Sequence, residues 1–232
     1  DALSDAARRL RQCDLNARTG LIPGDDEIGR LAHDFDDMAG AFQSKEAQLA
    51  RTNRALRVLS AGNRTLLRVK QEQTLLEEMC RAIVEAGGYQ MAWVGYAEGD
   101  EGLRPMASWV AEEGDLEKPR ISAEECPTGA AIRQGIPIAV RDIPALQNQG
   151  PGRDLAPSRH YSSCLALPLK INSAIIGVLN ICAEEPGALG DEETSLLSEA
   201  AADLSFGIGS QRLHAARARL AASLKRSEER FR

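Results

Sequence analysis

The hydrophobic positions in the N-terminal part of the chain recur at alternating gaps of three and four residues. The repeat comprises Ile28, Leu31, Phe35, Met38, Phe42, Lys45, Leu49, Thr52, Leu56, Leu59, Asn63 and Leu66. A mean period of 3.5 residues keeps one stripe of a helix facing a second helix, as in a coiled coil. The spacing therefore predicts one long helix whose stripe forms a helix–helix seam.

Polar residues interrupt this stripe at Lys45, Thr52 and Asn63. Polar seam residues lower stability while fixing register and strand number, and Gly62 adds a helix cost of about 1 kcal/mol relative to alanine. Two interpretations stay open: a rod that switches between two packings of similar energy, and a passive, somewhat frayed spacer.

The remaining pattern alternates between helical and strand-like segments. An amphipathic helical face beginning near Thr74 ends at Gly87 and Gly88, and a last helix starts at the acidic run Asp191–Glu193. A short helix is expected over 128–134. Strands are expected over 91–96, 104–110, 136–140, 164–170 and 174–182, the last two forming a hairpin around Asn172 and Ser173. This arrangement predicts an α+β domain.

The C-terminal segment repeats the three/four spacing. Its apolar positions are Leu213, Leu220, Leu224 and Phe231, with Arg217 and Ser227 at the polar positions of the same series. We expect this segment to form an exit helix that pairs with a second helix.

Composition narrows the class of protein. The 232 residues carry a net charge of −6, which argues against general nucleic-acid binding. The five cysteines are widely spaced, a pattern that fits a reducing compartment better than a disulfide framework. No apolar run reaches the length of about 18 residues that a membrane span needs. The three histidines are scattered, and no catalytic motif, metal-site spacing or cofactor motif is evident.

Residues 1–50 resemble the HAMP module of bacterial membrane receptors. The resemblance rests on Asp14-Leu15 in a connector, on Asp26–Gly29 at the start of the long helix, and on the apolar positions that follow it. Cys13 departs from the family, which usually has glycine before the Asp-Leu pair. The resemblance implies a parallel four-helix bundle made by two chains and a membrane span upstream, so we interpret the chain as a cytoplasmic fragment of a longer inner-membrane protein.

The central part resembles a GAF domain, a small-molecule sensing module with an antiparallel sheet and flanking helices. The segments that carry the resemblance are Gly88–Tyr96, Pro127–Ile132, Ser162–Leu169 and Ile176–Ile181. It implies a ligand site between the sheet and the segments covering one face. The implied site residues are Trp93, Trp109, Cys126, Thr128, Asp142, His160 and Tyr161. Binding of an unidentified small molecule and a purely structural role remain equally open.

The segments define an expected organisation. We expect a HAMP-like unit over 1–50, a coiled-coil linker with the first GAF helix over 51–73, a GAF domain over 74–210 and an exit helix over 211–232. The end of the chain, Ser227–Arg232, resembles the opening of a PAS module.

The expected function is a sensory relay in a parallel homodimer. It would pass a signal to an output domain of the same parent chain, a histidine kinase or a cyclic-di-GMP enzyme. The fragment itself has no catalytic constellation. The alternative is a structural dimerisation cassette that senses nothing, and a stand-alone enzyme is the third hypothesis.

The stripe predicts a crosslinking outcome. Leu49→Cys and Leu56→Cys should each form an intermolecular disulfide under mild oxidation, because both positions lie on the expected seam between two parallel helices. Non-reducing electrophoresis measures the rate. Rates that do not depend on the upstream or ligand state would contradict the switching interpretation and support the passive spacer, and a chain that stays monomeric at high concentration would contradict the coiled coil.

Overall fold

A computed structural model of the chain describes residues 2–21, 26–98, 102–111, 126–143 and 161–230. It divides into two compact units, Asp1–Asn53 and Arg54–Arg232. The helices are α1 (Ala2–Arg11), α2 (Glu27–Arg68), α3 (Glu72–Gly87), α4 (Pro127–Gln134) and α6 (Asp191–Arg230). The strands are β1 (Met91–Glu98), β2 (Gly102–Val110), β3 (Ile138–Val140), β4 (Ser163–Ile171) and β5 (Ala174–Ala183).

In the first unit, hydrogen bonds attach the connector after α1 to α2. The amide and the hydroxyl of Thr19 both donate to the Asp36 carboxylate, each over 2.8 Å. Arg18 donates to the side-chain oxygen of Gln43 over 2.8 Å. Cys13 has a φ of 65°, in the left-handed region where an L side chain costs about 1–2 kcal/mol. A backbone of this kind favours glycine, which agrees with the glycine that the resemblance to HAMP modules usually implies at this position.

The second unit is built on one antiparallel sheet with the strand order β2-β1-β5-β4-β3. Because side chains alternate between the faces of a strand, the register gives each face its own residues. The α4 face is formed by Met91, Trp93, Ile138, Val140, Cys164, Ala166, Val178, Asn180 and Cys182. The α6 face is formed by Ala92, Val94, Tyr96, Leu165, Leu167, Leu169, Leu179, Ile181 and Ala183.

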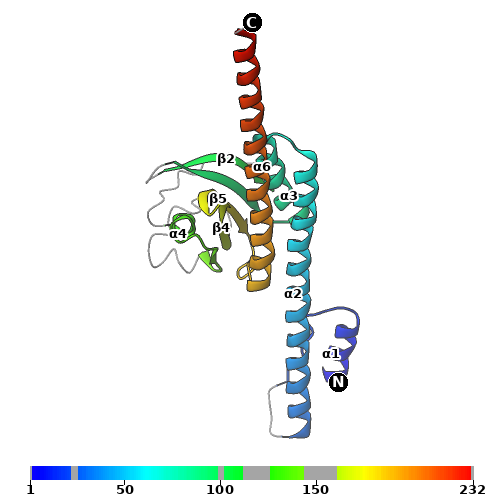
Figure 1. Cartoon of the computed structure of the whole chain (residues 1–232). Coiled ribbons are helices and arrows are strands. Elements are labelled where there is room, and N and C mark those ends of the chain that lie inside the picture. The colour runs from blue at the N-terminus through cyan, green and yellow to red at the C-terminus, as the bar shows by residue number, and fades with distance from the viewer. Residues whose placement is uncertain (1, 22–25, 99–101, 112–125, 144–160, 231–232) are drawn as a thin grey trace. The chain divides into compact units, whose positions relative to one another are not determined.

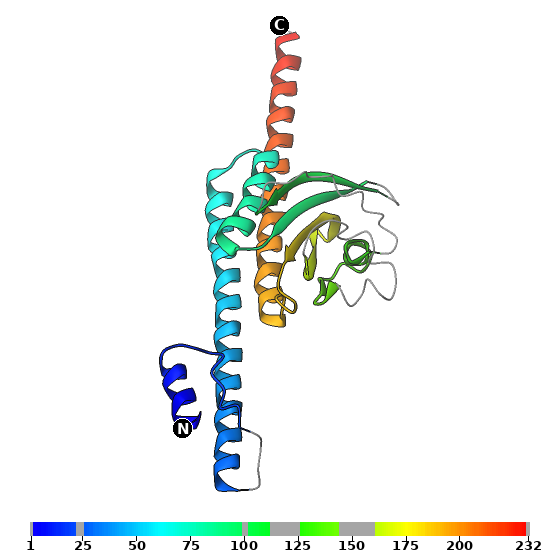
Figure 2. The same cartoon turned by 180° about the vertical axis from the view of Figure 1, so that it is seen from behind.

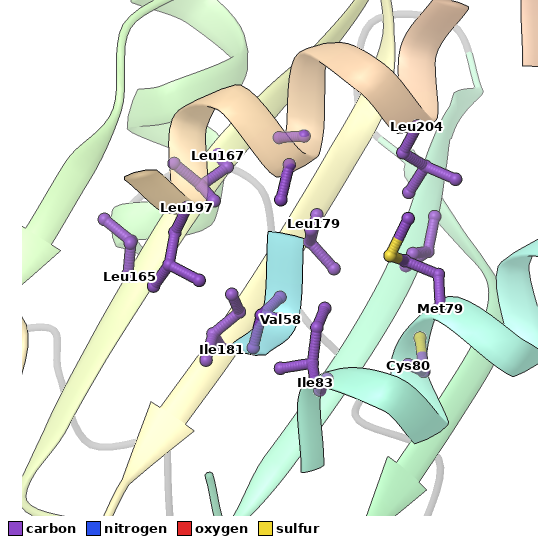
Figure 3. Packing of buried hydrophobic residues seen from close by; sticks show 14 of the residues in the cluster. Val58, Met79, Cys80, Ile83, Leu165, Leu167, Leu179, Ile181, Leu197 and Leu204 are labelled. Carbon is purple, nitrogen blue, oxygen red and sulfur yellow. The ribbon is translucent and has the colours of Figure 1, made fainter. Parts of the chain in front are cut away.

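Helices cover the two faces unequally. The helices α3 and α6 pack on the α6 face, and α4 lies on the opposite face against β3, β4 and β5 (Figures 1 and 2). The side chains between the sheet and the helices of the α6 face form the main hydrophobic core, in which Leu179 and Ile181 meet Leu197 and Ile83 (Figure 3). Burial of such apolar side chains contributes about 1.5–3 kcal/mol each.

The second half of α2 joins this core, and two glycines permit its close approach. A Cβ atom on Gly207 of α6 would lie 2.3 Å from the Leu66 side chain. A Cβ atom on Gly62 would lie 3.0 Å from the end of the Met79 side chain. Gly62, which the sequence marks as a weak point in a rod, is therefore a contact position for α3.

The main elements expected from the sequence are confirmed. The long helix, the helix that ends at the left-handed Gly88, the β4–β5 hairpin and the α4 segment all form. The strand expected over 136–140 is shorter and begins at Ile138. Leu59 and Leu66, expected on the intermolecular seam, instead pack against the core of their own chain because α3 and α6 lie against this part of α2.

The backbone of Cys13 generates a stability prediction. Cys13→Gly should be more stable in the connector than Cys13→Ala by about 1 kcal/mol, because only glycine takes a φ of 65° without steric cost. Amide hydrogen exchange of Thr19 should then be about fivefold slower in the glycine variant. At neighbouring Gln12, where φ is not positive, glycine should give no such gain over alanine. Equal exchange in Cys13→Gly and Cys13→Ala would contradict the assignment of strain.

Candidate functional site

The α4 face contains one buried polar pair in otherwise apolar surroundings. The hydroxyl of Thr128, in the first turn of α4, donates to the Oδ1 atom of Asn180 over 2.9 Å. Both residues are buried, with Asn180 only 3% exposed. The Nδ2 atom of Asn180 has no hydrogen-bond partner within the described part of the chain. An unpaired buried donor costs about 1–3 kcal/mol, so this amide is an unusual feature of the face.

Strand register fixes the neighbours of Asn180. It lies on β5 directly opposite Trp93 of β1 on one side and Ala166 of β4 on the other. Trp93 is buried and packs with Ala166, Val178 and Ala131. A Cβ atom on Gly95 would lie 2.7 Å from the Trp93 ring, so the glycine leaves room for the indole over the strand.

Three cysteines border this pair. Cys126 is the N-cap residue of α4, and its sulfur accepts from the amide of Gly129 over 3.4 Å. Cys164 and Cys182 lie directly opposite one another on β4 and β5. Burial, with a smaller contribution from Cys126, raises the pKa of Cys164 to about 12, and burial raises the pKa of Cys182 well above its usual value. Both thiols are therefore protonated at neutral pH and act as small apolar side chains.

The structure brings together only some of the site residues expected from the sequence. Trp93, Cys126 and Thr128 lie on or above the α4 face. Tyr161 also reaches this side, where its hydroxyl contacts the Met91 sulfur at 3.5 Å.

The other expected residues do not join this group. Trp109 pairs with Ala92 and therefore points to the opposite face, at the edge of the sheet, where Arg81 lies 5.5 Å from its ring centroid. Trp93 and Trp109 were expected at one ligand site, but the strand register places them on opposite faces of the sheet. Asp142 is exposed beyond the end of β3, and His160 lies outside the described residues.

On the α6 face, a buried ion pair joins the beginning of α6 to α2. Glu193 is 2% exposed and accepts from Arg54 over 3.0 Å and from the hydroxyl of Tyr89. The Arg54 guanidinium also lies 4.6 Å from the centroid of the Tyr89 ring. We call this group the Glu193 cluster. Burial is the largest single influence on the pKa of Arg54 and lowers it, but the charges of Glu193, Tyr89 and Glu185 and the hydrogen bond to Glu193 together outweigh burial, so the pKa is raised.

A second group of the same composition holds α6 farther along. Arg212 of α6 donates to both carboxylate oxygens of Glu72, over 2.9 and 2.7 Å, and Tyr96 donates to Glu72 over 2.7 Å. The Arg212 guanidinium lies 4.9 Å from the centroid of the Tyr96 ring. The bonds from Arg212 lower the pKa of Glu72 and outweigh the effect of burial. We call this group the Glu72 cluster.

The two clusters were not anticipated from the sequence. The arginine and the glutamate of each cluster are far apart in the chain. From the sequence alone, an isolated arginine or glutamate in a helix is usually expected to be exposed to solvent. The acidic start of α6 was predicted as the beginning of a helix, but the buried ion pair of Glu193 was not.

Long helices expose apolar side chains outside the core. On α2 the exposed seam residues are Ile28, Leu31, Met38, Phe42, Leu49 and Leu56, and Phe35 is half-buried. On α6 they are Leu213, Leu220 and Leu224. Phe206, which is 78% exposed and one heptad before Leu213, extends the α6 stripe and was missed in the sequence. Among the described residues, no helix combines the length and apolar character of a membrane span, and no group of side chains could hold a metal ion.

Comparisons with known proteins agree with this architecture. The sequence model of the GAF_2 family, described as GAF domain, matches residues 69–208, and the HAMP domain model matches residues 1–44. None of the curated proteins matches the chain.

Solved structures with the same fold include enzymes and signalling domains. A free methionine-R-sulfoxide reductase from Neisseria meningitidis is 20% identical with a TM-score of 0.58, and the match covers 73% of this chain and 93% of that one. The GAF domain of a phosphoenolpyruvate-protein phosphotransferase from Coxiella burnetii is 18% identical with a TM-score of 0.56, covering 70% and 98%. The corresponding Acinetobacter domain is 16% identical with a TM-score of 0.55, covering 67% and 94%. At these identities the likeness shows the fold alone.

The cysteine environments generate a reactivity prediction. Exposed Cys13 should react rapidly with a thiol reagent at pH 8, whereas buried Cys80, Cys164 and Cys182 should react only after denaturation, because the raised pKa values leave almost no thiolate. Reaction with Ellman's reagent, with and without denaturant, measures this. Cys13→Ser should lose the fastest phase. Rapid native-state labelling of Cys164 or Cys182, located by mass spectrometry, would contradict their burial.

Proposed function

The chain belongs to the GAF domain family, and we propose that its GAF domain senses a small molecule and passes the signal along its helices to an output domain. The HAMP and GAF domains themselves indicate a signalling or sensory role. The proposal adds that the chain works as a parallel homodimer, as the cytoplasmic part of a membrane receptor. The fragment transmits a signal and performs no catalysis of its own.

The single observation that supports this proposal most directly is the course of α6. Its first half packs Leu197, Leu204 and Ile208 into the core beneath the sheet. The same helix continues through Leu220 and Leu224, which are exposed. Because a helix is stiff over this length, displacement of its buried half by a rearranged sheet would move the exposed apolar stripe. That stripe is where a second copy of α6 would pack.

The Glu193 and Glu72 clusters supply the contacts through which a movement of α2, α3 or β1 would be transmitted to α6. They lie about 28 Å apart along α6, at 1.5 Å per residue. One connects α6 to α2 and the other connects it to α3 and β1. The Arg212–Glu72 pair is bidentate and therefore directional, so a shift of α3 or β1 would change the preferred position of α6. The Arg54–Glu193 pair adds a charge-assisted hydrogen bond between α6 and α2.

Dimerisation follows from the exposed stripes of α2 and α6. Their three/four spacing is the pattern that buries a seam between parallel helices, and water-exposed leucines at this spacing are costly in a monomer. In the parent protein, the dimer would receive input from the membrane side through the HAMP unit and deliver it to a histidine kinase or cyclic-di-GMP output domain. A non-sensing dimerisation cassette is the competing function, and it requires only the stripes.

A crosslinking experiment tests the relay and separates it from the cassette. In a Cys13→Ser background, Leu220→Cys should form an intermolecular disulfide, because residue 220 lies on the exposed stripe of α6. Glu72→Gln should change the crosslinking rate at residue 220 by at least about threefold, since it weakens the attachment of α6 to α3 and β1. Non-reducing electrophoresis over time measures the rate.

The matched control is Glu85→Gln on α3, because Glu85 pairs only with Arg81 of the same helix among the contacts described. It should leave the rate at residue 220 unchanged. Crosslinking that is efficient but identical in the Glu72→Gln variant would favour the passive cassette. A monomer in light scattering at high concentration would contradict both functions.

A further inference from the structure

We propose that Asn180 and the first turn of α4 form an acceptor-binding site for a small uncharged ligand that carries a carbonyl oxygen on an apolar body. This inference rests on the proposed sensing function and specifies the chemistry of its ligand. Three observations support it. Within the described part of the chain, the Asn180 side chain has unused donors, the start of α4 lies beside it, and the strand residues nearest Asn180 are uncharged.

The orientation of the Asn180 amide determines which hydrogen-bonding groups the site presents to a ligand. Its Oδ1 atom accepts the Thr128 hydroxyl over 2.9 Å, which fixes the orientation of the amide. The two N–H bonds of Nδ2 are buried and have no acceptor among the described residues. An amide nitrogen can only donate, so the missing partner of Nδ2 must be an acceptor.

The start of α4 adds donors of the same kind. The first N–H groups of a helix lack intrahelical acceptors, and Pro127 in the first turn has no N–H to offer. The amide of Gly129 is occupied only by the sulfur of Cys126 at 3.4 Å, a weak acceptor. Thr128 of the same turn is bonded to Asn180, so the start of α4 lies next to this side chain.

The strand side chains on this face determine the charge and polarity of the ligand. The strand residues nearest Asn180, which include Trp93, Ala166 and Val178, are uncharged and apolar, and Lys170 lies farther along β4, near Gly135 at the end of α4. A carboxylate buried beside Asn180 would have no cation at these nearest strand positions, and an uncompensated buried charge is unfavourable. A neutral carbonyl, as in an amide or lactam, satisfies the donors without that penalty, and its apolar body can pack against Trp93.

Three probes of equal chain length test this chemistry. Hexanamide presents a neutral carbonyl, hexanoate a carboxylate and hexylamine a cation. In the full chain at pH 8, hexanamide should shift the side-chain NH₂ resonances of Asn180 in NMR spectra at millimolar concentration. Hexanoate should bind at least about tenfold more weakly, and hexylamine should leave these resonances unmoved. The resonances are assigned as those that disappear in Asn180→Asp.

Variants connect binding to the donor atoms. Asn180→Asp replaces both donors by an acceptor and should weaken hexanamide binding by at least about tenfold. The matched control Asn172→Asp lies in the exposed β4–β5 turn and should bind hexanamide like the parent chain. Circular dichroism establishes that each variant is folded, and the resonance shifts of the parent chain test the site without any substitution.

The outcomes separate this inference from the proposed function. Unmoved Asn180 resonances with hexanamide, equal binding by the Asn180→Asp variant, or tightest binding of hexanoate would each overturn the neutral-acceptor site. A relay that responds to Glu72→Gln would survive any of these results. Conversely, suppose that hexanamide binds without changing the crosslinking rate at residue 220, and that Glu72→Gln leaves that rate unchanged as well. These two results together would contradict the relay but support the ligand site at Asn180.

Discussion

The burial of Glu193 is the constraint on which the arrangement of the second unit depends. A carboxylate that is 2% exposed is tolerated only with a cation and hydrogen-bond donors beside it. Arg54 and Tyr89 supply them from α2 and from the segment that leads into β1. Removing one member of such a group costs about 3–5 kcal/mol. The first turn of α6 is therefore held against α2 more specifically than apolar packing alone would require.

The sheet connects the two chemical environments of this unit. On β5, Asn180 points to the α4 face while its neighbours Leu179 and Ile181 point into the core beneath α3 and α6. Protein interiors are closely packed, so a displacement of side chains on one face of the sheet also shifts those on the other face. This alternation gives a physical route from a ligand at Asn180 to α6, with the Glu72 cluster acting on the same strand pair through Tyr96.

Sequence reasoning was most successful where a local rule decides the outcome. The apolar repeat predicted the helix that spans Glu27–Arg68, and the turn at Asn172-Ser173 predicted the β4–β5 hairpin. It failed at pairs whose relation depends on register. Trp93 and Trp109 both look like aromatic walls in the sequence, but antiparallel pairing sends them to opposite faces. The arginine partners of Glu193 and Glu72 could not be identified, because each arginine is separated from its glutamate by more than a hundred residues of chain and no periodicity relates the two.

By itself, the sequence determined the element types, the α+β class and the apolar stripes, since these follow from hydrophobic period and turn chemistry within a few residues. Only the tertiary structure decided how those stripes are used. It packed Leu59 and Leu66 against the core of their own chain and left Leu56 and Leu220 exposed. It also placed the Nδ2 atom of Asn180 beneath α4 with no hydrogen-bond partner among the described residues. The reason is that burial, ion pairing and donor satisfaction depend on contacts between distant segments, which the period of a single helix or strand does not contain.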